Sequence, residues 1–262
     1  MNLKTKLFTF AVLTFTAFAC NKKNCDGMLY GIPVSNTGLD NSRCQPVCEC
    51  DGKTSKSFTA EELSLMKAYT NTNPIAEITT NPYDLPAEIK PAGVCAVFID
   101  DKVNKKYHLE TFSTEAEAES AGAIVTHIDA CGACSSLQDL TVYAENLDVG
   151  AEVRKCAILN LSNPLDSLIL CIENIGFTTP CAQIWAYNTK NTQAECFSVC
   201  ISNNTYNNED GTLSECLQCD ETKSGPVFKA VAGRTRRNTG IANAICRFCE
   251  EVQVVEHNYN LK

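Results

Sequence analysis

The sequence has little of what catalytic and nucleic-acid-binding proteins commonly use. Only three of its 262 residues are histidines, aromatic residues make up 8%, and 22 lysines and arginines face 31 aspartates and glutamates. A chain with this acidic balance lacks the basic surface that nucleic-acid phosphates require. It also lacks a G-x-S-x-G motif, which marks the nucleophile of α/β-hydrolases. The acidity itself favours solubility.

The main apolar run is too short to span a membrane. It covers residues 7–18, follows Lys4 and Lys6, and ends in small residues before Cys20. About a dozen apolar residues after a basic start are typical of a secretory signal peptide, whereas a membrane-spanning helix needs about 20. We therefore predict a signal peptide over residues 1–19 and an extracytoplasmic protein.

The residues before Cys20 resemble a bacterial lipobox, in which a cysteine after a small residue becomes the lipid-bearing first residue. The match is imperfect, because Ala17 stands where such motifs usually carry leucine and Phe18 is bulky. Acylation of Cys20 leaves 16 of the 17 cysteines, an even number that can pair completely. We predict a cell-envelope lipoprotein, in the outer membrane or at the cell surface, that meets the membrane only through this lipid. Plain secretion is the alternative.

Seventeen cysteines dominate the composition, and they are unevenly spread. None lies between residues 51 and 94, whereas twelve lie between residues 95 and 249. An oxidising compartment favours their pairing, and each disulfide contributes about 2–4 kcal/mol, mainly by restricting the unfolded chain. Disulfides therefore replace part of the hydrophobic core. The order in which the cysteines pair cannot be derived from one sequence.

Closely spaced cysteines recur as three C-x2-C motifs, Cys131/Cys134, Cys216/Cys219 and Cys246/Cys249. On a helix, spacings of three and four place both sulfurs on one face, which favours bonds to two cysteines of a neighbouring element. The last two motifs could instead form a zinc site with four cysteine ligands. Their gap of 26 residues exceeds the usual spacing of roughly 15–20, and export removes the reducing compartment. We predict neither a metal nor another cofactor.

The pattern of apolar and turn residues predicts an α+β fold, a helix-rich disulfide-stapled domain with a small antiparallel sheet near its start. The predicted parts are a cysteine module plus one helix (20–70), a Pro/Asn-rich linker or surface strap (71–93), the disulfide-rich α+β domain (94–251) and a frayed tail (252–262). Thr59 and Glu62 predict a capping box at the start of the first helix. Residues 94–99 and 107–112 predict a β-hairpin.

Further elements follow from caps and periodicity. Ser113 or Thr114 is expected to begin a helix that Gly122 ends, and residues 123–128 predict a third strand. Additional helices are predicted after Cys134 and over residues 152–161, 165–175, 181–200, 226–232 and 241–250.

Residues 123–142 resemble the thioredoxin arrangement, in which a strand delivers a C-x-x-C motif to a helix N-terminus. That arrangement would lower the thiol pKa of Cys131 and make it nucleophilic. The segment lacks the aromatic residue that usually precedes the first cysteine, and no cis-proline strand follows. A structural Cys131–Cys134 pair is therefore favoured, and an extracytoplasmic thiol-disulfide oxidoreductase is the second functional hypothesis.

A small hydrolase is the third hypothesis. It would combine His127 with Asp129 or Asp139 and with a serine at position 135 or 136. A catalytic triad is defined by geometry rather than by proximity in sequence, and both serines also suit the first turn of a helix. We therefore assign no catalytic residue, and Cys131, Cys134, His127 and Asp129 remain only candidates.

Basic residues gather in one stretch of this acidic chain. Lys229, Arg234, Arg236 and Arg237 lie in or next to a loop that is predicted to lead into a helix N-terminus at residue 238 or 239. Guanidinium groups and a helix N-terminus both favour anions. These residues are therefore candidates for binding an anionic ligand. Internal pairing with the protein's own carboxylates is the alternative.

The stretches CGACSSLQDLTVY and SGPVFKAVAGRTRRNTG resemble segments of an uncharacterised family of secreted, cysteine-rich proteins. The resemblance spans roughly residues 95–249 and implies no named activity. We therefore expect an exported protein that acts by binding, with an anionic ligand or another envelope component as its partner.

Overall fold

The structure is a computed structural model, and it describes residues 28–45, 49–50, 53–54, 56–85, 92–202 and 205–262. The predictions for the signal peptide and for Cys20 lie outside these residues. Within them, no helix is both long and apolar enough to cross a membrane.

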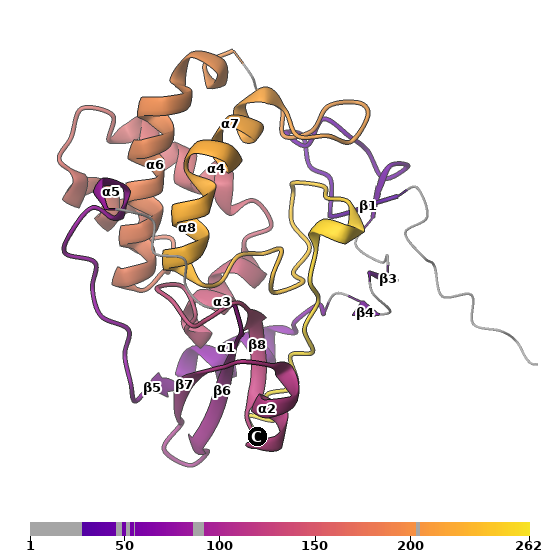
Figure 1. Cartoon of the computed structure of the whole chain (residues 1–262), viewed down its shortest axis with the longest axis vertical. Coiled ribbons are helices and arrows are strands. Elements are labelled where there is room, and N and C mark those ends of the chain that lie inside the picture. Colours follow the sequence, from indigo (N-terminus) through magenta and orange to yellow (C-terminus); the bar gives the residue numbers. More distant parts are fainter. Residues whose placement is uncertain (1–27, 46–48, 51–52, 55, 86–91, 203–204) are drawn as a thin grey trace, which may run out of the picture.

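The described chain has the predicted α+β fold, with eight α-helices, small sheets and seven disulfides (Figure 1). The helices are α1 (Ala60–Ala68), α2 (Glu115–Ser120), α3 (Leu137–Glu145), α4 (Val149–Leu159), α5 (Leu165–Glu173), α6 (Thr179–Cys200), α7 (Glu215–Lys223) and α8 (Gly225–Ala232). The strands are β1 (Leu29–Tyr30), β2 (Cys44–Gln45), β3 (Glu49–Cys50), β4 (Lys53–Thr54), β5 (Thr70–Asn71), β6 (Val94–Asp101), β7 (Lys106–Phe112) and β8 (Ile124–Ile128). Two short 3-10 turns are η1 (Pro82–Asp84) and η2 (Cys249–Glu251).

The main sheet has the strand order β5-β7-β6-β8. The predicted hairpin is confirmed as β6 and β7, and the predicted third strand is β8, antiparallel to β6. No sequence pattern indicated β5, a two-residue strand that pairs parallel with β7 at the sheet edge. In Figure 1 this sheet lies below the helical layer that contains α6, α7 and α8.

Both faces of the sheet are covered, and β6 shows how. Cys95 and Val97 belong to the main core, whereas Val94 and Ala96 pack in a second cluster with Ala118 of α2. This alternation follows from the two-residue period of a strand.

Local capping signals operate as the sequence predicted. The Thr59 hydroxyl accepts a bond from the Glu62 amide (3.2 Å), and the Glu62 carboxylate accepts one from the Thr59 amide (2.8 Å). Thr114, rather than Ser113, caps α2. Gly122 follows that helix with φ of +80°, a conformation that glycine adopts without steric cost.

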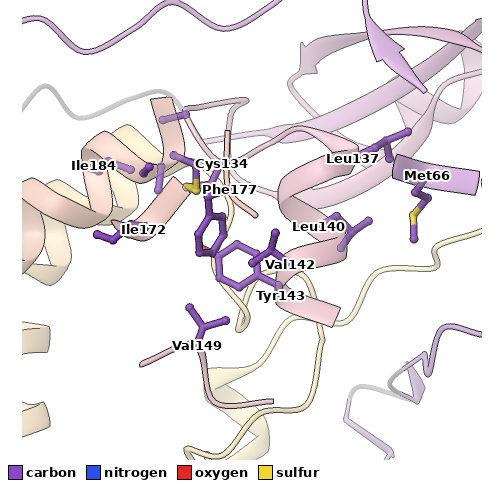
Figure 2. Close-up of a cluster of buried hydrophobic side chains, with 14 of the residues drawn as sticks. Met66, Cys134, Leu137, Leu140, Val142, Tyr143, Val149, Ile172, Phe177 and Ile184 are labelled. Atoms are coloured by element: carbon purple, nitrogen blue, oxygen red, sulfur yellow. A yellow bond between two sulfur atoms is a disulfide. The ribbon is translucent and has the colours of Figure 1, made fainter. Parts of the chain in front are cut away.

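The main core lies between α3, α5 and α6 and also includes Met66 of α1 (Figure 2). Leu137 and Leu140 of α3 are fully buried there, as are Ile172 of α5 and Ile184 of α6. The 22-residue α6 packs against α5, α7 and α8 and is thus the central helix.

The disulfides join elements that are distant in sequence. Cys44 bonds to Cys246 and Cys50 to Cys249, which fixes the first cysteine module against the last part of the chain. The other pairs are Cys95–Cys131, Cys134–Cys181, Cys156–Cys171, Cys196–Cys219 and Cys200–Cys216. The cysteines at positions 20, 25 and 48 lie outside the described residues. The four cysteines considered as zinc ligands are thus all in disulfides, each with a different partner.

The expected helices near the end of the chain need correction. Residues 241–250 form no α-helix, whereas α7, which was not predicted, covers residues 215–223. Of the two alternatives for residues 71–93, the described part is a strap, because Ile78 and Tyr83 pack against the main core and the Tyr83 hydroxyl donates to Asn188 of α6.

The final segment is not a frayed tail, because Val252, Val254, His257 and Tyr259 are buried. Nε2 of His257 lies 3.0 Å from the Thr239 carbonyl oxygen, and Nδ1 lies 2.8 Å from the Tyr259 hydroxyl. Since a carbonyl can only accept, Nε2 carries the proton and Nδ1 accepts. Docking this segment therefore buries an uncharged imidazole.

Stability should fall in mild acid because of His257. Burial lowers its pKa from 6.5 to about 3, so the unfolded chain takes up a proton below pH 6.5 that the folded chain does not. The contribution of the uncharged imidazole to the free energy of unfolding is complete above pH 6.5. It declines below that pH, by about 2 kcal/mol between pH 7.5 and pH 5.

Denaturant unfolding at the two pH values measures this difference. His257→Gln, which keeps one donor and one acceptor, should reduce the pH dependence by that amount. Asn258→Gln, at the exposed residue next to His257, carries no titrating group and should leave it unchanged. An equal pH dependence in the wild type and His257→Gln would refute the assignment.

Candidate ligand-binding pocket

Cys131 and Cys134 do not form the predicted pair. Cys131 bonds to Cys95 of β6, and Cys134 bonds to Cys181 of α6. Helix α3 begins only at Leu137, so neither sulfur lies in its first turn. Two separate structural bonds replace the expected C-x-x-C disulfide, and the resemblance to thioredoxin ends there.

His127 and Ser135 do meet, but inside the protein. Nε2 of His127 lies 2.7 Å from the Ser135 hydroxyl, and both side chains are fully buried. Nδ1 of His127 lies 2.8 Å from the Ile128 carbonyl oxygen, to which it can only donate. The Ser135 hydroxyl therefore donates to Nε2 and also accepts from the Gly132 amide (2.8 Å). This arrangement holds the 127–135 loop together.

The two aspartates named with His127 have other partners. Asp129 accepts from the Asn238 side chain (3.0 Å), and Asp139 accepts from Ser136 and from the Thr178 amide. Burial raises the pKa of Asp139 to about 6, although these hydrogen bonds oppose the rise. Both ring nitrogens of His127 are already bonded to Ile128 and Ser135, so the described residues assemble no triad.

Arg234 is fully buried and bonded within the protein. Its Nε donates to the Cys134 carbonyl (3.0 Å), and its Nη atoms donate to the Ser135 carbonyl and to the carbonyl and hydroxyl of Thr126. A longer contact of 3.5 Å reaches the Thr239 hydroxyl. A guanidinium has five N–H donors, and all five are used here. Arg234 therefore takes no part in the ligand site described below.

The other three basic candidates line one cavity. Its volume is about 150 Å³, and it lies where α6, α7 and α8 meet the start of α4 with the two residues before it (147–150) and the loop segment 235–247. Lys229, Arg236, Arg237 and also Arg247 line this pocket. The loop does not lead into a helix, since residues 238–262 contain no α-helix. The predicted helix N-terminus is thus absent from the site, and side chains supply its positive charge.

One side of the pocket is aromatic. The rings of Trp185 and Phe228 meet edge to face, with centroids 4.8 Å apart. The Trp185 indole donates to the Tyr143 hydroxyl (3.0 Å), which ties α6 to α3. Together the three rings make a rigid apolar wall.

The charged side of the pocket centres on Glu221 of α7. Its carboxylate contacts Arg247 (2.7 Å), Arg237 (2.8 Å) and Lys229 (3.0 Å). Burial alone would raise the pKa of Glu221, but these three cations lower it to about 2. Arg247 also lies 3.6 Å from Glu251. One partly buried carboxylate therefore organises three basic side chains.

Arg236 and Asp220 complete the lining. The Arg236 guanidinium lies over the Tyr143 ring (5.6 Å to the centroid) and donates to the carbonyls of Asn146 and Ala242. Burial lowers the pKa of Arg236 to about 10, so the side chain stays charged at neutral pH. Burial raises the pKa of the Asp220 carboxyl, against a hydrogen bond from Thr192.

Sequence reasoning found the cations of this pocket but missed Glu221 and the aromatic wall. Clustered basic residues are easy to recognise in an acidic sequence. Glu221, in contrast, is one of many acidic residues and lies on a helix that was not predicted. Tyr143 and Trp185 are ordinary candidates for core residues. Only the packing of α3, α6 and α8 brings them to the arginines.

Comparison with known proteins gives no activity. A family model described as a family of unknown function (DUF8771) matches residues 165–255, which extend from α5 through η2 and include most of the pocket lining. No curated protein matches the chain, and no solved structure does.

Replacement of Arg234 should destabilise the protein strongly. Arg234→Met leaves the carbonyls of Cys134, Ser135 and Thr126 without their donors, and we expect a loss of about 3–5 kcal/mol in the free energy of unfolding. Arg154→Met, at an exposed position, should cost less than about 1 kcal/mol. Urea unfolding of both variants measures this. A small loss at Arg234 would show that the buried network is not essential to the fold.

Proposed function

We propose that this is an extracytoplasmic binding protein that holds a small anionic ligand in the pocket between α6, α7 and α8. The observation that carries the proposal is the charge balance of the pocket. Four cations line it, Lys229, Arg236, Arg237 and Arg247, against three carboxylates, Asp148, Asp220 and Glu221.

This local excess is unusual in a chain with net charge −9. A cluster that served only for internal pairing would be balanced by the surplus of carboxylates around it. Arg237 instead has one acceptor among the described residues, the Glu221 carboxylate, and about a fifth of its side chain is exposed. Lys229 likewise bonds only to Glu221 within the described part of the chain. Both retain N–H donors that can reach a ligand.

The compartment follows from the cysteines. Seven disulfides among the described residues fit a protein that folds in an oxidising, extracytoplasmic environment. Cleavage of the signal peptide and acylation of Cys20 belong to the proposal on sequence grounds. Incorporation of labelled palmitate that is lost in Cys20→Ser tests this part, and label retained by the variant would refute it.

Anions should stabilise the folded protein through Arg237. At an anion concentration about tenfold above Kd, a bound ligand contributes roughly 1.4 kcal/mol, which raises the melting temperature by about 3–5 °C. Arg237→Gln should remove most of this rise while lowering the unliganded melting temperature by only a few degrees. Thermal melts in phosphate, acetate and chloride at equal ionic strength measure the effect.

Arg154→Gln is the matched control, because it removes an exposed arginine outside the pocket. Equal melting temperatures in all three salts, or a rise that Arg237→Gln leaves intact, would contradict the proposal.

A further inference from the structure

We infer that the ligand is a monocarboxylate carried on a single flat ring. This inference rests on the proposed function and narrows the chemical class of its ligand. It follows from four features of the pocket, namely its volume, its aromatic wall, the charge left unneutralised and a buried hydroxyl donor.

The volume of the cavity favours a ligand whose apolar part is one ring. A cavity of about 150 Å³ is large enough for one benzene ring, whereas a fused ring system or a long chain would extend beyond it into solvent. Trp185 and Phe228 stand edge to face beside it, and Tyr143 also lines it. Aromatic side chains attract a further ring by offset or edge contacts in addition to burying its surface.

The net charge of the side chains at this side of the pocket limits the ligand to one negative charge. Lys229, Arg237 and Arg247 carry three positive charges, and their nearest carboxylates, Glu221 and Glu251, carry two negative ones. One positive charge remains at this side of the pocket. A single carboxylate neutralises it, whereas a dianion would bring an excess negative charge next to Glu221.

The Tyr143 hydroxyl provides a donor inside the pocket. The side chain is 2% exposed, and its oxygen accepts from Trp185. An indole N–H can only donate, so the hydroxyl hydrogen must point elsewhere. Within the described chain no acceptor for it is found, and Tyr143 lines the cavity. A ligand oxygen would complete this hydrogen bond.

Glu221 sets how tightly such a ligand binds. Its carboxylate already contacts the three cations, so it competes with the ligand for the same donors. Arg237 still has N–H groups that no described residue accepts, and a guanidinium can hold a carboxylate through two of them. The ligand carboxylate is therefore expected beside Glu221, on Arg237 and Lys229.

The test compares four probes on the oxidised full-length protein by isothermal titration. Benzoate has ring and charge, acetate has charge alone, benzyl alcohol has the ring alone, and phthalate has the ring with two charges. Benzoate should bind at least about tenfold more tightly than each of the others. Acetate lacks the buried ring, benzyl alcohol lacks the ion pair, and phthalate is repelled by Glu221.

Variants assign the contacts. Arg237→Gln should weaken benzoate by about tenfold without changing benzyl alcohol, and Phe228→Leu should weaken benzoate without changing acetate. Glu221→Gln should tighten benzoate and remove the discrimination against phthalate. Lys67→Gln, at an exposed ion pair with Glu145, is the matched control and should change nothing. Melting curves confirm that each variant is folded at the titration temperature.

The outcomes separate the two proposals. If acetate binds as tightly as benzoate and both depend on Arg237, the anion site stands and the ring inference is wrong. If phthalate binds more tightly than benzoate, the inference that the ligand carries a single negative charge is wrong. If none of the four probes binds, the ring inference is wrong, and the melts in phosphate decide separately whether the anion site exists. If benzyl alcohol and benzoate bind equally and independently of Arg237, the proposed anion-binding function fails as well.

Discussion

The two cysteines of each C-x2-C motif bond to different, distant partners and not to each other, and the rest of this structure depends on that constraint. Cys131 and Cys134 bond to the sheet and to α6, Cys216 and Cys219 to two positions on α6, and Cys246 and Cys249 to two strands near the N-terminus. A pair that closed on itself would restrict only a short loop. Pairs that diverge restrict two larger loops each, and they fix the segment that carries the motif at two separate positions in the chain.

The pocket is a consequence of this framework. Its polar side includes the irregular segment 235–247, which contains no α-helix. Backbone hydrogen bonds join this segment to Ile128 of β8 and to Tyr30 of β1. Two further anchors hold it. At its end, Cys246 is bonded to Cys44. At its start, Gly233 packs so closely on Gly132 that a Cβ on Gly233 would lie 2.6 Å from the Gly132 amide nitrogen. The buried Arg234 then binds the loop that carries Cys134. Arg237 can therefore hold a fixed position beside Glu221.

Sequence reasoning succeeded where a residue acts on its immediate neighbours. Thr59, Thr114 and Gly122 define helix ends by local hydrogen bonds or backbone freedom, and the alternating hairpin residues define a two-sided sheet. It failed over residues 241–250 because apolar spacing there resembles a helix. In the structure the Asn238 side chain bonds to the Ile128 and Gly233 carbonyls, and the Asn243 side chain accepts from the Ile245 amide. Such bonds offer the backbone an alternative to a helix.

In the candidate site, too, the sequence predicts local features and not those that depend on tertiary packing. The cations are visible in the sequence as a local excess of positive charge, and three of the four candidate basic residues line the pocket. Their geometry depends on Glu221, whose helix α7 has no apolar face of its own and is fixed to α6 through Cys196–Cys219 and Cys200–Cys216. The role of Arg234 could not be predicted, because only tertiary packing decides whether an arginine in a loop faces solvent or backbone carbonyls.

A disulfide map of the oxidised protein tests the divergent framework most directly. Proteolysis at low pH, followed by partial reduction, differential alkylation and mass spectrometry, distinguishes the two sulfurs of each motif. The account predicts cross-linked peptides that join Cys95 to Cys131 and Cys134 to Cys181. A bond between Cys131 and Cys134 themselves would contradict it, and would reopen the redox interpretation of that motif.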